Sequence, residues 1–279
     1  MTGILLDVRW GAYSHTGNHR EENQDAHLAN PPVFVVADGM GGHASGREAA
    51  ELVVQAFQDT SWGTWVTPQS LKDATATANR LVRELGRQVG GAPGSTLTGV
   101  GLAVHDDEPC WLIFNIGDSR TYLMRDDVLE QVTVDHSHHQ ALVDLGMRSD
   151  ATPTDRRSNV ITQAIGGGLP QAPVLDQWLL PARAGDRILL CSDGLTGEVS
   201  DQLIGATLQA APNPQKAATA LVAAAIAGAG RDNITALVVD AGHVSGTPVP
   251  ADLPGADDTV DESGIELSGD TRPDLEVVP

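Results

Sequence analysis

The chain has 279 residues, of which 41% are hydrophobic and 19% charged, with a net charge of −20 and an isoelectric point of about 4.5. This acidity, without any conspicuous basic patch, argues against nucleic acid and anionic membranes as partners. The length suffices for one substantial core, and we expect one domain over residues 1–243 and a tail over 244–279.

The two cysteines and the N-terminus indicate where the protein resides. Cys110 and Cys191 each lie in an apolar, strand-like run, which is typical of buried thiols in a reducing compartment rather than of a disulfide framework. The first residues have neither the basic region nor the long apolar stretch of a signal peptide. The longest run of small apolar residues, 221–230, is shorter than the roughly 20 residues that cross a bilayer. We therefore expect a cytoplasmic protein that is not associated with a membrane.

The hydrophobic pattern predicts strands and helices in alternating groups. In chain order we expect strands 5–12 and 33–37, helices 45–58 and 70–89, strands 97–104, 111–116 and 120–124, helix 138–145, strand 187–191, helices 200–210 and 214–227, and strand 235–239. The three strands within 97–124 follow one another with short connections, which indicates antiparallel pairing. Pairs of helices between groups of strands favour sheet packed on sheet with helices outside over a doubly wound parallel sheet.

Two segments differ from the rest of the chain. Residues 245–279 contain nine acids, one arginine and five prolines, which predicts a disordered acidic tail. Residues 137–159 combine a short helix with a polar, turn-rich stretch and are interpreted as a surface insertion, a mobile flap near the functional site.

Four aspartates are the candidate functional residues. Asp38, Asp118, Asp193 and Asp232 each adjoin a glycine or an asparagine in a short turn-like segment. An isolated Asp-Gly pair is usually a turn, but Asp38 and Asp193 directly follow apolar strands, which offer rigid support to a ligand. Carboxylates that converge in this way would form a site for Mg²⁺ or Mn²⁺, which prefer oxygen ligands. The pattern thus indicates metal-assisted chemistry, and we expect it to act on phosphate.

An ordered set of short motifs accompanies these aspartates. It comprises residues 20–25 (Arg-Glu-Glu-Asn-Gln-Asp), 35–42, 94–96, 117–120, 135–137, 164–166, 192–195 and 231–235. Over about residues 5–240, the chain resembles the bacterial form of the metal-dependent Ser/Thr protein phosphatases of type 2C, the PPM family. The resemblance implies an α+β fold, a four-layer αββα sandwich in which two antiparallel sheets are flanked by helices.

The resemblance also implies a binuclear Mn²⁺ or Mg²⁺ centre. Asp38 would bridge the two ions, the Gly39 carbonyl would bind one of them, and Asp193 and Asp232 would bind the other. Asp118 would complete, with Asp193, a third and weaker site. In such a centre the nucleophile is a metal-activated water, so that no serine or cysteine nucleophile is needed.

Further residues are implied by the same resemblance. Arg20 would hold the phosphate, because a guanidinium can bind two phosphate oxygens at once. Asp25 and Asn233 would support the metal ligands and their waters. Met40 stands where eukaryotic members carry a histidine, and it has no proton to donate. The identity of any general acid therefore stays open.

The function expected from these features is hydrolysis of phosphoserine and phosphothreonine in proteins, opposing a bacterial Ser/Thr kinase. The partners would be that kinase and its phosphorylated substrates, and we expect a monomer. Two alternatives remain. One is a phosphatase for an anti-sigma-type partner or a small phosphate ester, since a fold does not fix a substrate. The other is a catalytically weak regulator that binds phosphoproteins.

Overall fold

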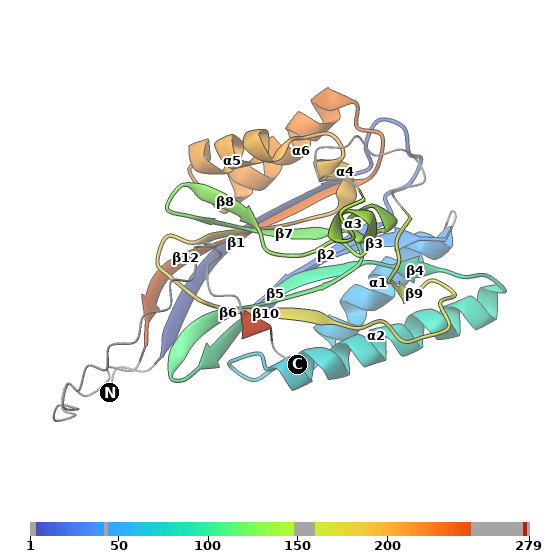
Figure 1. Ribbon diagram of the computed structural model, residues 1–279, viewed down its shortest axis with the longest axis horizontal. Helices are drawn as coiled ribbons and strands as arrows, with labels where there is room; N and C mark the ends of the chain where they lie inside the picture. Colours follow the sequence, from blue (N-terminus) through green and yellow to red (C-terminus); the bar gives the residue numbers. More distant parts are fainter. Residues whose placement is uncertain (1–3, 42–43, 148–159, 247–275, 278–279) are drawn as a thin grey trace.

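The computed structural model describes residues 4–41, 44–147, 160–246 and 276–277, and shows two β-sheets between two layers of helices (Figure 1). The strands pair antiparallel in every ladder that joins two of the strands described. The expected four-layer αββα sandwich is therefore confirmed. Within the described ranges, no helix combines the length and the apolar content that crossing a bilayer requires.

The smaller sheet has five strands in the order β1-β12-β11-β7-β8. Their bounds are β1 Leu5–His15, β7 Arg120–Arg125, β8 Val128–Gln131, β11 Arg187–Cys191 and β12 Ile234–Ser245. Its outer face is covered by α5 (Asp201–Ala210) and α6 (Pro214–Gly228), with the single turn α4 (Asp193–Thr196) at the end of β11.

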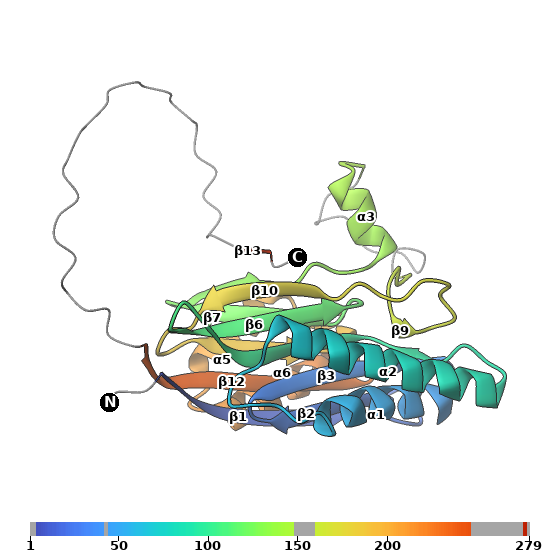
Figure 2. The same ribbon diagram turned by 90° about the horizontal axis from the view of Figure 1, so that it is seen from below.

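The larger sheet has the order β13-β10-β6-β5-β3-β4-β9, and β2 also pairs with β3. Its strands are β2 Asp25–Asn30, β3 Val33–Met40, β4 Gly94–Ser95, β5 Leu97–His105, β6 Glu108–Ile116, β9 Ile165–Gly166, β10 Asp176–Pro181 and β13 Glu276–Val277. Helices α1 (Ala44–Gln58) and α2 (Pro68–Val89) cover its outer face, and α3 (His138–Asp144) stands apart at one end (Figure 2).

Three apolar clusters hold the four layers together. The middle cluster lies between the sheets, where Phe34 and Trp111 of the larger sheet meet Ile188 and Leu237 of the smaller one. A second cluster packs the larger sheet against α1 and α2, and a third packs the smaller sheet against α5 and α6. Alternate residues of each central strand face opposite layers, and both of these layers are packed against the sheet. The residues on both faces are therefore apolar, and the sequences of these strands are nearly continuous apolar runs.

Every expected strand and helix is present, with bounds that differ by a few residues. The expectation omitted β2, β8 and β10, along with the two-residue strands and the short α4. Of the tail expected over 244–279, residues 247–275 and 278–279 lie outside the described residues, and so do residues 148–159 of the expected flap, so that their disorder and motion stay predictions. The tail differs from the expectation at its two described ends, where β12 continues to Ser245 and residues 276–277 form the short strand β13.

Candidate metal centre

The four aspartates come together at one end of the sandwich because of the strand directions. Asp193 lies two positions after the last residue of β11, and Asp232 lies two positions before the first residue of β12. Because these neighbouring strands are antiparallel, the end of one and the start of the other lie at the same end of the sheet. Asp38 lies near the end of β3, and Asp118 lies in the turn between β6 and β7. Asp25, at the start of β2, pairs directly with Asp38 across the larger sheet.

These carboxyl groups are buried near enough to one another for the charge of each to raise the pKa of its neighbours. Burial raises the pKa of Asp38 well above its ordinary value, and the charges of Asp25, Asp193, Asp118 and Asp232 raise it further. Burial, followed by the charge of Asp193, raises the pKa of Asp118 to about 8. Buried like charges are unfavourable together unless a proton or a cation neutralises them.

The donor set fits divalent cations of the Mg²⁺ and Mn²⁺ type. All of these side chains offer hard carboxylate oxygens, which those ions prefer. Among the described residues, no three His, Cys, Asp or Glu side chains lie close enough together to hold one metal ion between them. An open arrangement suits ions that keep several water ligands and take only one or two carboxylates each.

Asp25 connects the two sheets beside this cluster. Its Oδ2 accepts hydrogen bonds from the Ser192 and Thr235 hydroxyls, each at 2.7 Å. Its Oδ1 is buried and has no hydrogen-bond partner within the described ranges of the chain. Burial raises the pKa of Asp25 to about 7, and the two hydroxyls oppose this effect. A buried acceptor beside the acidic cluster is what a hydrated cation would satisfy, as expected for a residue that supports the metal ligands.

Asn233 fastens the segment between β1 and β2 to the start of β12. Its Nδ2 donates to the carbonyls of Thr16 and Glu22, at 2.9 and 2.8 Å, and its Oδ1 accepts the backbone N–H of Gln24 at 2.8 Å. This amide therefore fixes the backbone on both sides of Arg20. The structure gives Asn233 a positioning role, which is compatible with the expected support of the site.

Arg20 lies at the rim of the acidic cluster, with about half of its side chain exposed. Its Nη2 contacts Asp232 Oδ2 at 2.6 Å. This hydrogen bond raises the pKa of Arg20, and the charges of Asp38 and Asp193 contribute in the same direction. The guanidinium thus lies at the edge of the acidic cluster, where it could contact a phosphate that enters the site.

Two glycines allow the backbone to close around the aspartates. A Cβ at Gly39 would lie 2.1 Å from the Gly46 carbonyl of α1, and a Cβ at Gly194 would lie 1.9 Å from the Asn233 carbonyl. Real Cβ atoms do not lie so close to a carbonyl oxygen. Only glycine therefore allows the two backbone segments to approach each other at these two positions. The expected coordination by the Gly39 carbonyl stays a prediction.

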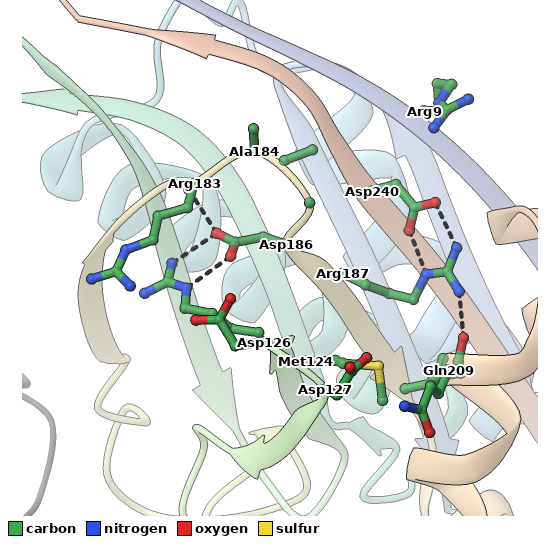
Figure 3. A pocket seen from close by; sticks show the side chains of 14 residues that line it. Arg9, Met124, Asp126, Asp127, Arg183, Ala184, Asp186, Arg187, Gln209 and Asp240 are labelled. Atoms are coloured by element: carbon green, nitrogen blue, oxygen red, sulfur yellow. Dashed lines mark hydrogen bonds and ion pairs between the residues drawn. The ribbon is translucent and has the colours of Figure 1, made fainter.

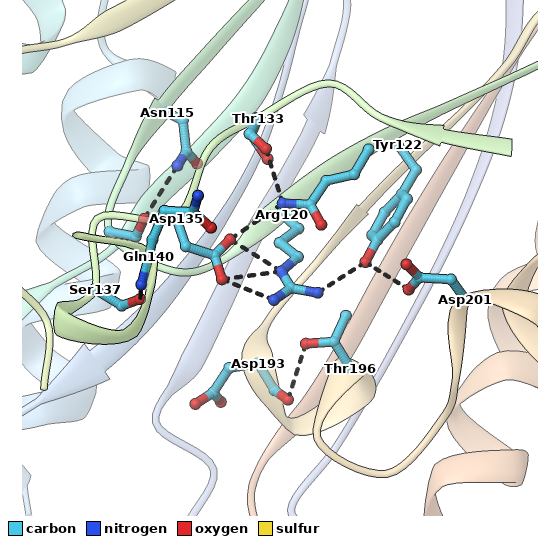
Figure 4. Close-up of polar contacts among 12 residues, drawn as sticks. Asn115, Arg120, Tyr122, Thr133, Asp135, Ser137, Gln140, Asp193, Thr196 and Asp201 are labelled. Atoms are coloured by element: carbon cyan, nitrogen blue, oxygen red, sulfur yellow. Dashed lines mark hydrogen bonds and ion pairs between the residues drawn. The ribbon is translucent and has the colours of Figure 1, made fainter. Parts of the chain in front are cut away.

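A network of charged contacts beside the cluster was not assigned from the sequence, although two of its residues, Arg120 and Asp135, lie in motifs. Arg120 binds the Asp135 carboxylate through Nε and Nη2, at 2.9 and 2.7 Å. Its Nη1 donates to the Tyr122 hydroxyl, which donates to Asp201 at 3.0 Å (Figure 4). This network lies beside Asp193 and ties the start of β7 to α5.

His136 is another residue whose role depends on tertiary contacts. Its Nδ1 accepts the backbone N–H of Gly117 at 3.1 Å, and its Nε2 lies 2.9 Å from Asp176 Oδ2. The ring therefore supports the turn that carries Asp118. No local pattern signals this pairing, because His136 and Asp176 are 40 residues apart.

An arginine-lined hollow of about 480 Å³ lies at the opposite end of the smaller sheet (Figure 3). Two of its guanidinium groups are already neutralised, since Arg187 binds Asp240 at 2.6 and 2.7 Å and Arg125 binds Asp186 at 2.8 and 2.7 Å. Arg187 begins β11, whereas Asp193 follows its end. This hollow is therefore separate from the acidic cluster.

The sandwich fold, with an acidic cluster at the ends of its sheets, is that of the type 2C class of protein phosphatases. The family described as Protein phosphatase 2C matches residues 13–225, and the chain belongs to this family.

Named relatives agree with this assignment. The chain is 36% identical to the Serine/threonine protein phosphatase PstP of Mycobacterium tuberculosis over 251 residues, which cover 86% of this chain and 46% of that protein. The chain thus spans about half the length of this relative. It is 30% identical to the Serine/threonine phosphatase stp of Listeria monocytogenes over 229 residues, covering 78% of this chain and 86% of stp.

A solved structure also carries metal. The catalytic domain of the serine threonine protein phosphatase PstP in complex with two manganese ions superposes with a TM-score of 0.74 at 35% identity. The match covers 86% of this chain and all of that domain.

Proposed function

We propose that this protein hydrolyses phosphoserine and phosphothreonine in other proteins, with two Mn²⁺ or Mg²⁺ ions as cofactors. The observation that carries the proposal is the cluster of five carboxyl groups at one end of the sandwich, with the Arg20 guanidinium at its rim. The names of the relatives and the two manganese ions of the PstP catalytic domain support the same activity and cofactor.

Each acidic residue would have a distinct role in holding the ions. Asp38 would contact both ions, the Gly39 carbonyl would bind one, and Asp193 and Asp232 would bind the other. Asp118, which couples to Asp193, would hold a third ion with it. When bound, the ions supply a water activated as nucleophile and positive charge that stabilises the phosphoryl oxygens.

The protein's own groups would orient the substrate and the site. Arg20 would exchange its contact with Asp232 for two phosphate oxygens, because a planar guanidinium matches that geometry. The hydrogen bonds from Ser192 and Thr235 would keep the Asp25 carboxylate in position, and its Oδ1 would accept a hydrogen bond from a water molecule at the site. Met40 cannot protonate the leaving group, and no general acid is assigned.

Phosphoryl transfer needs little covalent help from the protein, since its transition state is loose and catalysis rests on positioning and charge. An open, half-exposed rim around Arg20 suits a phosphate presented on a protein chain. We infer that the substrates are the products of a Ser/Thr kinase in the same cell.

The decisive experiment measures hydrolysis of an aryl phosphate by the full chain with Mn²⁺, with EDTA, and in the variants D38N and D193N. We expect EDTA to abolish activity and each variant to lose at least about a hundredfold in kcat/KM, because each removes a ligand charge. D73N, at an exposed position of α2, is the matched control and should retain activity. Equal activity in all of these samples would refute the metal mechanism.

The substrate class needs its own measurement. Phosphothreonine and phosphoserine peptides should be cleaved much faster than phosphotyrosine peptides of the same sequence. A preference for phosphotyrosine would contradict the proposed class, and binding of phosphopeptides without turnover would indicate a regulator instead of an enzyme.

A further inference from the structure

A second cavity, of about 520 Å³, lies between α2 and the segment that leads into β10. We call it the α2–β10 groove. It is lined on one side by Lys72, Thr75, Ala76 and Asn79, and on the other by residues 172–177. None of these residues belongs to the acidic cluster.

The groove contains buried polar atoms that the protein does not satisfy. Gln177 is only 2% exposed, and neither its Oε1 nor its Nε2 has a hydrogen-bond partner among the residues that the structure describes. Thr75, across the groove and 5% exposed, has an Oγ1 that is likewise without a partner in the described part of the chain. Such groups destabilise a protein when they stay unpaired, and native proteins rarely contain them. A ligand with both an N–H donor and a C=O acceptor, such as a peptide main chain, would give the Oε1 and the Nε2 of Gln177 one partner each.

The strand beside the groove already receives an extended segment. One edge of β10 pairs with β6, and along its other edge the chain's own β13 pairs antiparallel (Figures 1 and 2). In this register Trp178 lies opposite Val277, and Leu179 lies opposite Glu276. Any strand that continues past Val277 in this register has its next residue opposite Gln177, the residue with the unpartnered amide.

We propose that the α2–β10 groove is a binding site for an extended peptide, and that its occupant is the C-terminal segment of this same chain, which enters as β13. Main-chain hydrogen bonds to the β10 edge would supply affinity, and the groove would accept the adjoining part of the docked strand. The 29 residues over 247–275 could span up to roughly 90 Å when extended, so that their length does not limit docking.

The apolar rim of the groove fits an apolar side chain from that segment. Val174 is 65% exposed, and Leu175 packs at the edge of the core cluster under α2. The sequence from Asp274 onward, Asp-Leu-Glu-Val-Val-Pro, carries apolar residues among its acids. A strand of this composition can pair with an edge strand and bury one face.

A disulfide test in the full chain examines the pairing directly. Cysteines are placed at paired positions in L179C/E276C, and at an unpaired tail position in L179C/D257C. Both variants are made in a C110A/C191A background, because Cys110 packs in the same cluster as Leu179 on the neighbouring strand β6 and could pair with the cysteine of L179C. We expect the 179–276 disulfide to form at least about tenfold faster than the 179–257 disulfide, because docking raises the effective concentration above that of a free tether. Equal rates would overturn the proposal.

The groove itself is tested by filling it. A76W adds an indole to the groove from an exposed position of α2, and A223W adds the same group to an exposed position of α6. In the L179C/E276C background, A76W should slow disulfide formation at least about fivefold, and A223W should not change it. If A76W leaves the rate unchanged, the groove is not where the segment binds. A disulfide between two chains would show that a second copy supplies the strand and would overturn the assignment to the same chain.

Hydrogen exchange on the unaltered full chain provides a test that needs no cysteines. The amides of residues 276–277 should exchange at least about tenfold more slowly than those of 257–262, and A76W should remove this difference. Equal exchange in both segments of the unaltered chain would overturn the proposal even where the cysteine variants fail to fold.

Discussion

Asp25 is a residue that acts through its neighbours. It belongs to the larger sheet, yet both hydroxyls that bind its Oδ2 come from the smaller one. In D25N the carboxylate charge beside the cluster is lost and one oxygen becomes a donor. We expect D25N to weaken Mn²⁺ binding about 10- to 100-fold, as measured by calorimetric titration of the full chain.

The D73N variant again serves as the control for the change from acid to amide, and should bind Mn²⁺ like the unaltered chain. S192A removes one of the two donors to Asp25 and should have a smaller effect than D25N. An unchanged affinity in D25N would show that Asp25 only links the sheets.

Arg20 offers a test of substrate binding at the same scale. Its side chain is half exposed and contacts the site through Asp232 alone among the contacts described. We expect R20A to raise KM for a phosphothreonine peptide about tenfold or more, and R20K to recover only part of the loss, because an ammonium cannot bind two oxygens in a plane.

A neighbouring arginine gives the control for this variant. Arg231 is at least as exposed and adjoins Asp232 in sequence, but it binds Glu198. R231A should leave KM nearly unchanged. A larger effect in R231A than in R20A would transfer the phosphate-binding role to Arg231.

At the scale of elements, one amide joins the loop before β2 to the start of β12. N233A would leave the Gln24 N–H and the carbonyls of Thr16 and Glu22 without their partner. We expect a loss of about 2–3 kcal/mol in the free energy of unfolding, and a melting temperature lower by roughly 5–10 °C. Thermal unfolding followed by circular dichroism measures this.

N213A is the matched change at a helix cap. Asn213 caps α6 by accepting the backbone N–H of Lys216 at 2.9 Å, and the loss of such a cap costs about 1 kcal/mol. If N233A were no more destabilising than N213A, the three contacts of Asn233 would not fix the loop.

The elements also show what a sequence can predict here. The central strands and the long helices were predicted because their apolar residues repeat with clear periods over many residues. The strand β2 was missed because its sequence, Asp-Ala-His-Leu-Ala-Asn, buries only Leu28. The strand β10 was missed because it contains Gln177 and ends in a proline, features that argue against a strand in isolation.

The candidate site likewise has residues that could be predicted from the sequence and contacts that could not. The metal-ligand candidates and Arg20 stand in motifs, and so the family resemblance could place them. The contacts of Asp25 with Ser192 and Thr235 join residues 167 and 210 positions apart, and no local pattern encodes such a pairing. The same holds for the pairing of His136 with Asp176. The sequence therefore predicts which residues gather at the site. The hydrogen bonds that fix these residues depend on how the two sheets pack, and the sequence does not predict them.

At the scale of the whole molecule, the two sheets bring buried acids together at one end, and this arrangement should make stability depend on pH and metal. Without metal, burial raises the pKa of Asp25 to about 7 and that of Asp118 to about 8, from an ordinary value of 3.8. Between about pH 4 and pH 8 the folded chain therefore holds protons that the unfolded chain has released. Stability must fall as pH rises through this window, since the unfolded state binds fewer protons.

We accordingly expect the melting temperature in EDTA to decrease by at least about 5 °C from pH 5 to pH 8.5, in buffers of equal ionic strength. If the proposed site exists, saturating Mn²⁺ should bind its ionised carboxylates and stabilise only the folded state, so that the difference between the Mn²⁺ and EDTA melting curves should grow with pH. D118N removes one of the raised groups and should flatten the slope in EDTA, whereas D73N should leave it unchanged. Melting temperatures that stay parallel across this pH range, with and without Mn²⁺, would mean that the acids do not share one site, because only a common site links their protons to the same ions.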